Sequence, residues 1–178
     1  MLLVVAATER ELAPIEGART AVCGIGPVEA AVATARALAE ERPSAVLHVG
    51  IAGARGLEPL TLVIGSEAVY CDAAGPLVPA RVLPDGGLVA RLRASFPEAV
   101  SRPIGTSARV GGSHAVDVEA MEGFAVLRAC ELAGVPAVEV RVVSNEIDEP
   151  DRARWRFEDA FALLAETTPR LAAVASAP

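Results

Sequence analysis

Short apolar runs rich in β-branched residues alternate along this chain with longer segments of helical pattern. The runs are bounded by glycine, proline or charge, as buried strands are, and they lie at Leu2–Ala7, Thr20–Cys23, Ala45–Val49, Thr61–Cys71 and Ala137–Ser144. Helical patterns with start or stop signals lie at Pro27–Glu41, Glu122–Ala133 and Phe157–Ala173. Such alternation is typical of α/β domains, so we expect a three-layer α/β/α fold around a mostly parallel, mixed central sheet.

The size and charge of the chain narrow its class. The 178 residues fit a single domain spanning 1–178, and residues 76–87, rich in proline and glycine, predict a surface excursion from it. With 16 basic and 23 acidic side chains the net charge is −7, which argues against a nucleic-acid binder. No apolar run approaches the roughly 20 residues of a membrane-spanning helix, and the first run lacks the basic leader of an export signal. We therefore expect a cytoplasmic protein with no membrane or nucleic-acid partner.

The cysteines and histidines do not predict a metal site. Cys23, Cys71 and Cys130 are odd in number and far apart, and none has CxxC spacing. His48 and His114 lie near none of them in the sequence. This pattern disfavours a zinc site and a disulfide framework, so we expect buried free thiols in a reducing compartment.

Ligands of α/β sheets bind at the carboxyl ends of the strands, so candidate functional residues should directly follow strands. Four segments do so: Glu9–Glu11, Gly24–Gly26, Gly50–Gly53 and Ser144–Asp148. The first glycine pair resembles the start of a GxGxxG fingerprint, but the third glycine position holds Glu29, whose carboxylate would repel a pyrophosphate. The chain also has no lysine for a Walker A loop. The glycine turn at 24–26 either faces a ligand or is a plain tight turn. The small residues at 50–53 allow close approach of either a ligand or a neighbouring helix.

Three charged residues stand out from this pattern. Glu11 follows the first strand and Glu122 begins a helix. Taken singly, Glu11 can simply belong to an acidic surface turn, and Glu122 can simply compensate the dipole of the helix that it begins. Arg141 lies within an apolar strand, where a charge is costly unless it is paired. We expect a carboxylate or an anionic ligand beside it.

Together these segments resemble the nucleoside phosphorylase/nucleosidase superfamily. The resemblance runs from Val4 to about Leu164 and rests on Glu11, the two glycine turns, the Ala-Met-Glu-Gly motif at 120–123 and Val-Arg-Val-Val-Ser-Asn at 140–145. The branch resembles the hydrolases that include methylthioadenosine/S-adenosylhomocysteine nucleosidase and futalosine hydrolase. The resemblance implies a phosphorylase/hydrolase-like fold, cleavage of a purine N-glycosidic bond without a metal or cofactor, and a homo-oligomer, either a dimer or larger.

The resemblance also implies roles for single residues. Glu11 matches the carboxylate that activates the attacking water, and Met121 and Glu122 match the pair that binds the ribose. Glycosidic cleavage passes through an oxocarbenium-like sugar cation. A carboxylate at the ribose hydroxyls stabilises that charge, and a second one takes the proton of the attacking water.

The purine and the 5′ substituent have matching positions as well. Asn145 matches the residue that faces purine N7, and Ser144 and Arg141 match residues that position it. Members that release adenine carry Asp at this place, and a protonated Asp can donate to N7. An amide instead offers a donor to O6 and an acceptor to a protonated N7, a pattern that fits a 6-oxopurine such as hypoxanthine. Trp155 matches an aromatic residue beside the 5′ substituent.

The substrate implied by these matches is futalosine, which carries hypoxanthine and is an intermediate of one route to menaquinone. Its 5′ end bears a benzoate, with which Arg152 or Arg154 could pair; both can equally be solvated surface residues. Two alternatives stay open: a methylthioadenosine/S-adenosylhomocysteine nucleosidase, and a degenerate protein that binds nucleosides without cleaving them.

Two further departures concern the pocket. His48 and Ile51 occupy the places where phosphorylases hold phosphate with Arg and Ser, and the Ile51 side chain has no donor, which favours water as the nucleophile. The segment 112–118 is shorter than its counterpart in the family. Just before it, Arg109 and Val110 occupy positions that face the purine, where Arg109 either contacts the base or points to solvent.

Overall fold

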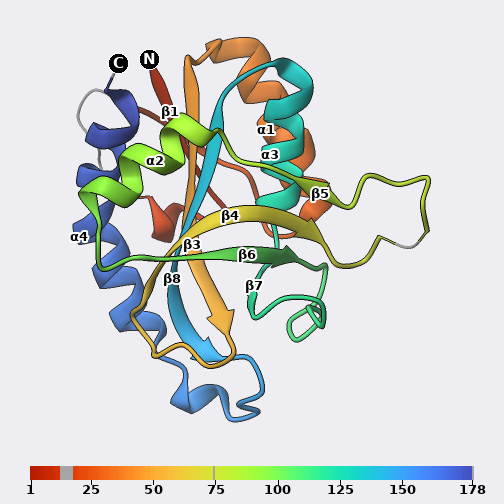
Figure 1. Cartoon of the computed structure of the whole chain (residues 1–178), viewed down its shortest axis with the longest axis vertical. Coiled ribbons are helices and arrows are strands. Elements are labelled where there is room, and N and C mark those ends of the chain that lie inside the picture. The colour runs from red at the N-terminus through yellow and green to blue at the C-terminus, as the bar shows by residue number, and fades with distance from the viewer. Residues whose placement is uncertain (13–17, 74, 178) are drawn as a thin grey trace.

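The computed structural model describes residues 1–12, 18–73 and 75–177, and within them the chain builds one eight-stranded sheet flanked by four α-helices (Figure 1). The strands are β1 (Leu2–Ala6), β2 (Arg19–Val22), β3 (Ala45–Ala54), β4 (Leu62–Tyr70), β5 (Arg81–Val82), β6 (Val100–Thr106), β7 (Val118–Ala120) and β8 (Ala137–Glu146). The helices are α1 (Pro27–Glu41), α2 (Gly86–Ser95), α3 (Gly123–Ala133) and α4 (Phe157–Ser176), with short 3-10 turns at Glu9–Glu11 and Arg152–Arg154.

The sheet is mixed and mostly parallel, as the sequence predicts. Its order is β2-β1-β3-β7-β6-β4-β5, and β8 pairs with both β3 and β4. The pairs β3–β7, β4–β8 and β4–β5 are antiparallel, and the other pairs are parallel. Strands β3, β7, β6, β4 and β8 therefore close on themselves. The closure brings the ends of β3, β7 and β8 together.

Helices cover both faces of the sheet, which confirms the three-layer arrangement. Side chains of β1 alternate between the faces, since Leu2 and Val4 pack in one apolar cluster and Leu3 and Val5 in another. The first cluster is covered by α2 and α4, and the second by α1 and α3 (Figure 1). Strands buried on both faces explain the uninterrupted apolar runs in the sequence.

Several elements differ from the expectation. Strand β3 continues through Gly50–Gly53, which was expected to follow the strand, because β7 and β8 pair with it as far as Ala54. A bulge in the β3–β8 pairing lies between Ala52 and Gly53. Helix α4 ends at Ser176 rather than at the expected Ala173, because Ala175 in the added turn packs on the core.

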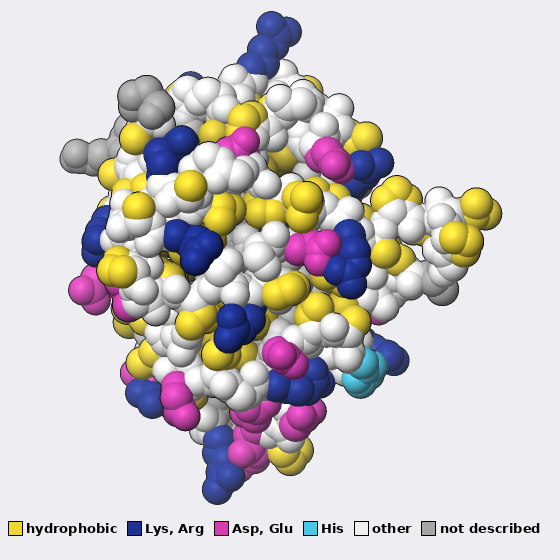
Figure 2. All heavy atoms as spheres, in the orientation of Figure 1, with side chains coloured by type: hydrophobic (Ala, Val, Ile, Leu, Met, Phe, Trp, Pro, Cys, Tyr) yellow, Lys and Arg dark blue, Asp and Glu magenta, His cyan; other side chains and the backbone are white. Residues whose placement is uncertain are grey.

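The sequence did not predict α2, β5, β6 or β7. The surface excursion expected at 76–87 is correct only for its first part, since residues 81–82 form β5 and α2 begins at Gly86. Before β5 the chain projects from the body of the molecule (Figure 2), and Leu77 there is 94% exposed. None of the helices in the described ranges is both long and apolar enough to cross a membrane.

Candidate active site

A cavity of about 340 Å³ opens where β3, β7 and β8 end. Arg109 and Arg154 do not line it, but nine other residues that the sequence assigns to the site do: Glu11, Ile51, Val110, Met121, Glu122, Arg141, Ser144, Asn145 and Trp155. These residues come from segments far apart in the chain. The volume is within the range of small-molecule sites.

Glu11 is held at the cavity by the turn that follows β1. Its Oε2 accepts hydrogen bonds from the backbone N (3.0 Å) and Oγ1 (2.9 Å) of Thr8. Its Oε1 accepts from the backbone N of Ile51 at 3.3 Å. The side chain is only 6% exposed although it belongs to a short surface turn. Glu11 is therefore a fixed carboxylate at the cavity wall.

Glu122 approaches the same cavity from the start of α3. Its Oε1 accepts from the backbone N of Gly26 at 3.1 Å, and its Oε2 lies 3.4 Å from Nη2 of Arg141. Gly24 and Gly26 have φ values of 80° and 93°, a region that favours glycine. The glycine turn thus directs a backbone N–H at a carboxylate of the site, and Ile25 between the two glycines lines the cavity.

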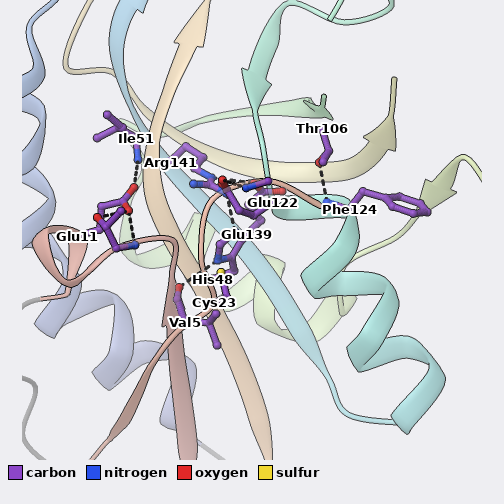
Figure 3. Close-up of polar contacts among 12 residues, drawn as sticks. Val5, Glu11, Cys23, His48, Ile51, Thr106, Glu122, Phe124, Glu139 and Arg141 are labelled. Atoms are coloured by element: carbon purple, nitrogen blue, oxygen red, sulfur yellow. Dashed lines mark hydrogen bonds and ion pairs between the residues drawn. The ribbon is translucent and has the colours of Figure 1, made fainter. Parts of the chain in front are cut away.

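Arg141 connects Glu139, Glu122 and His48 through its guanidinium (Figure 3). Its Nε donates to Oε1 of Glu139 at 2.8 Å, and its Nη2 reaches both Glu122 and Nε2 of His48. The predicted carboxylate partner of this buried arginine is confirmed. Burial alone would lower the pKa of Arg141, but Glu139, Glu122 and Glu11 raise it above its usual value, so the guanidinium stays charged.

His48 is a completely buried, neutral imidazole. Its Nδ1 lies 3.0 Å from the carbonyl oxygen of Val5 and its Nε2 lies 2.5 Å from Nη2 of Arg141. Arg141 can only donate, so Nε2 accepts and Nδ1 carries the proton. Burial, followed by the nearby charge of Arg141, holds the pKa of His48 well below 6.5. His48 is not among the residues lining the cavity, so it offers no donor to an anion there.

Gly50 makes room for this arrangement. A Cβ atom on Gly50 would lie 2.2 Å from Nη1 of Arg141 and 2.7 Å from Oε1 of Glu11. The sequence left open whether the small residues of this segment admit a ligand or a helix. At Gly50, the neighbours are two side chains of the site itself.

Asn145 and Ser144 lie at the bulge between β3 and β8. Oγ of Ser144 lies 2.8 Å from Oδ1 of Asn145 and 3.1 Å from the carbonyl oxygen of Ala52. Nδ2 of Asn145 donates to the carbonyl oxygen of Glu146 at 3.0 Å. The amide keeps one N–H and one lone pair of Oδ1 for a ligand.

An aromatic wall lines another side of the cavity. It consists of Trp155, Phe157 and Phe161, with Trp155 edge-on to Phe157 at 5.3 Å between ring centroids. Sequence reasoning missed the two phenylalanines, because aromatic residues four apart on a helix are also typical of a core. Arg152 lines the cavity near this wall, with its guanidinium carbon 5.3 Å from the Trp155 ring centroid. Arg154 does not line it and forms an ion pair with Glu149 at 3.0 Å.

The segment before β7 forms the remaining wall. Val110 lines the cavity and is 50% exposed, whereas Arg109 is exposed and lies outside the lining residues. Glu119, which the sequence analysis did not single out, is buried and lines the cavity. A signal for it was available in the sequence: Glu119 lies between the apolar residues Val118 and Ala120, and burying an unpaired charge there costs free energy, as it does for Arg141 in β8.

Metal-ligand groupings and disulfides are not seen in the described part of the chain. There, no three His, Cys, Asp or Glu side chains are grouped so as to hold a metal ion. Cys23, Cys71 and Cys130 are free thiols; the first and last are buried, and Cys71 is half-buried. Burial raises the pKa of Cys23 to about 12, with Glu122 adding to the shift, and raises that of Cys130 to about 12.

Comparison with known proteins finds futalosine hydrolases among the relatives of this chain. Futalosine hydrolase of Streptomyces coelicolor is 48% identical over 56 residues, which are 32% of this chain and 24% of that protein. Futalosine hydrolase of Acidothermus cellulolyticus is 33% identical over 178 aligned residues, covering 80% of this chain and 73% of that protein.

A solved structure shares the fold. The 5′-methylthioadenosine/S-adenosylhomocysteine nucleosidase of Neisseria meningitidis, crystallised in complex with methylthio-immucillin-A, is 26% identical with a TM-score of 0.79, and the match covers 98% of this chain and 97% of that chain. The sequence profile of the phosphorylase superfamily matches residues 18–177. This chain is therefore a member of the phosphorylase superfamily.

Proposed function

We propose that this chain hydrolyses the N-glycosidic bond of a purine nucleoside. The observation that carries the proposal is that Glu11 and Glu122 line one cavity and both lie close to the Arg141 guanidinium. With Glu139, three carboxylates surround this single guanidinium. The surplus of negative charge favours a positive charge in the cavity, and the sugar of a glycoside develops one as the bond breaks.

In this mechanism Glu122 accepts hydrogen bonds from the ribose hydroxyls. Met121 packs beside the sugar, and Glu11 takes the proton of the attacking water. The bonds from Thr8 and Ile51 hold the Glu11 carboxylate in place, so little reorganisation is needed when the water attacks. Asn145 binds the leaving purine, and Ser144 orients its amide.

Water rather than phosphate is the nucleophile in this proposal. Nε2 of His48 accepts from Arg141, and the Ile51 side chain has no donor. The backbone N of Ile51 already donates to Glu11. A phosphate in this part of the cavity would meet the carboxylates of Glu11 and Glu122, and the Arg141 guanidinium beside them is already paired with Glu139 and Glu122.

The substrate we propose is futalosine, with hypoxanthine and dehypoxanthine futalosine as products, which places the reaction in menaquinone synthesis. The futalosine hydrolases among its relatives support this choice, as does the amide at Asn145. The aromatic wall with Arg152 suits a 5′ substituent that combines a ring with a carboxylate. Arg109 keeps its proposed contact with the base only if its exposed side chain turns inward on binding.

Incubation of the purified protein with futalosine and with methylthioadenosine, followed by chromatography of the free bases, tests the proposal. Hypoxanthine release should exceed adenine release. Glu11→Gln should lower kcat by about 10²–10⁴-fold, whereas Glu9→Gln, at an exposed position of the same turn, should leave it unchanged. Faster release of adenine would favour the alternative of a methylthioadenosine/S-adenosylhomocysteine nucleosidase, which the Neisseria structure supports. Binding without cleavage, insensitive to Glu11→Gln, would indicate a degenerate nucleoside-binding protein.

We further propose that the chain, a single domain over 1–178, acts as a homo-oligomer. Helices α1 and α3 form an apolar groove that exposes Val28 (72%), Val32 (66%) and Leu132 (71%). The groove begins at Pro27, two residues from Ile25 at the cavity, so a second copy of the chain seated on it would reach the site. Light scattering should show a dimer or larger species, and Val32→Glu should dissociate it; a monomeric wild-type protein would contradict the proposal. The cytoplasmic location remains a prediction from the sequence.

A further inference from the structure

Glu119 is a third carboxylate in the cavity, and the mechanism above gives it no role. It is 6% exposed and lies in the middle of β7, which is only three residues long. In the described part of the chain no arginine lies within ion-pair distance of it. A buried carboxylate is costly unless hydrogen bonds replace its lost water, so the donors around Glu119 decide what it can still bind.

Glu119 and Asn145 flank the same glycine. Gly53 of β3 pairs with Glu119 on one side and with Asn145 on the other. Two strand spacings separate the two residues, about 10 Å between their backbones. Gly53 between them has no side chain, and a Cβ there would lie 3.0 Å from Nδ2 of Asn145. All three residues line the cavity, so they form a floor with a polar side chain at each edge.

The Glu119 carboxylate presents acceptors to this floor. Its Oε1 accepts from the backbone N of Gly111 and its Oε2 from that of Ser113, both at 2.5 Å. These bonds fix its orientation, and each oxygen keeps a further lone pair. An ionised carboxylate can only accept, so it favours a ligand that donates.

The two candidate purines differ at one ring nitrogen. Hypoxanthine carries a hydrogen on N1, next to its 6-oxo group, whereas adenine has a bare lone pair at N1. With the N7 and O6 edge at Asn145, the N1 side of the base faces the opposite edge of the floor.

We propose that Glu119 accepts a hydrogen bond from N1–H of a 6-oxopurine and so selects against 6-aminopurines. This inference rests on the proposed function and names the part of its substrate that this wall recognises. The selection proposed here is made by Glu119 at N1, whereas the proposed function relies on Asn145 at N7 and O6.

Glu119 also holds the segment before β7, and the test separates that role from base recognition. Arg55 holds the same segment through Nη1, which donates to the carbonyl oxygen of Ser113 at 2.8 Å, but Arg55 does not line the cavity. Arg55→Gln is therefore the matched control. Loosening of this wall should weaken binding of both bases in the same direction.

Calorimetric titration of hypoxanthine and adenine into wild type, Glu119→Gln and Arg55→Gln tests the proposal. In Glu119→Gln, hypoxanthine affinity should fall about 10–100-fold, and adenine affinity should hold or rise, because a glutamine amide can donate to N1. Equal losses for both bases in Glu119→Gln would overturn the proposal.

A measurement on the wild type covers the case in which Glu119→Gln does not fold. There, 1-methylhypoxanthine, which lacks the N1 hydrogen, should bind at least about tenfold more weakly than hypoxanthine; equal affinity would overturn the role of Glu119. If the wild type binds hypoxanthine more tightly than adenine and Glu119→Gln keeps the same preference, only this inference is refuted. A wild type that prefers and releases adenine refutes the proposed substrate as well.

Discussion

The backbone of Gly50 lies against the guanidinium of Arg141, so closely that a methyl group on Gly50 would sit 2.2 Å from Nη1. Strands β3 and β8 pair in parallel at this point, with Gly50 in register with Arg141. The arginine side chain thus passes over a residue of β3 that has no side chain and so leaves space for it. This contact fixes where the positive charge lies between Glu11 and Glu122.

Gly50→Ala should therefore impair both stability and catalysis. The added Cβ must displace Arg141 or Glu11, and overpacking of this kind costs about 1–3 kcal/mol of unfolding free energy. Activity should fall even at temperatures where the variant is folded, because the displaced groups belong to the site. Urea unfolding and initial rates measure the two effects.

Gly86→Ala is the matched control for this change. No atom lies within 4 Å of a Cβ on Gly86, the first residue of α2. Alanine is the better helix former by up to about 1 kcal/mol, so this variant should be as stable as wild type or more so. Wild-type stability and rates in Gly50→Ala would contradict the crowding described above.

His48 should make the protein sensitive to acid. Its pKa is held well below 6.5 in the folded state by burial and by Arg141, whereas the unfolded chain takes up a proton near 6.5. Unfolding therefore binds a proton below that pH. Stability should fall as the pH drops below about 6.5, by at most about 1.4 kcal/mol per pH unit from this group.

His48→Gln tests this linkage, because the Gln side chain can still accept from Arg141 but does not titrate. Its unfolding free energy should change less between pH 7 and 5 than that of the wild type. His114→Gln, at an exposed histidine, should keep the wild-type slope. Equal slopes in all three proteins would show that His48 is not the group responsible.

The thiols should differ in reactivity. Thiolates are the reactive form, and the pKa values of Cys23 and Cys130, each raised to about 12 by burial, leave almost none at pH 8. A thiol reagent should therefore modify only Cys71 in the folded protein and all three cysteines after denaturation. Cys71→Ser should abolish the rapid phase; rapid modification of this variant would mean that a buried thiol is accessible.

The strands and helices with clear apolar patterns were predictable from the sequence, and those with mixed patterns were not. Strand β6 contains Pro103 and Gly105, which usually argue against a strand within a sheet. Helix α2 begins with two glycines, although Asp85 before it caps the backbone N of Leu88 at 2.8 Å. That cap, followed by buried Leu88 and Leu92 four residues apart, was the signal available for α2.

The positions of the site residues followed only in part from a simple rule, and their contacts did not. Glu11 follows β1 as the rule predicts, whereas Asn145 lies within β8, which runs to Glu146 instead of ending at Ser144. Glu122 was assigned from the family resemblance, and it follows β7, a strand that the sequence did not predict. The three residues lie together because the ends of these strands meet at the cavity. The sequence also required a partner for Arg141. The sequence did not identify Glu139 as that partner: residues two apart on a strand share a face, but this alone does not show that their side chains touch. The position of Glu119 could not be predicted either, because it depends on the pairing of β7 with β3.

Arg152 and Arg154 should differ in their effect on the substrate. Arg152 lines the cavity beside Trp155, whereas Arg154 points elsewhere and pairs with Glu149. If Arg152 binds the carboxylate at the 5′ end, Arg152→Met should raise KM for futalosine about tenfold or more and leave KM for inosine, which has no such group, unchanged. Arg154→Met removes the same charge from the same turn and should change neither the KM for futalosine nor the KM for inosine. An equal rise of KM for futalosine in both variants would indicate a general attraction by positive charge, and no change in either would leave the aromatic wall as the part that recognises the 5′ end.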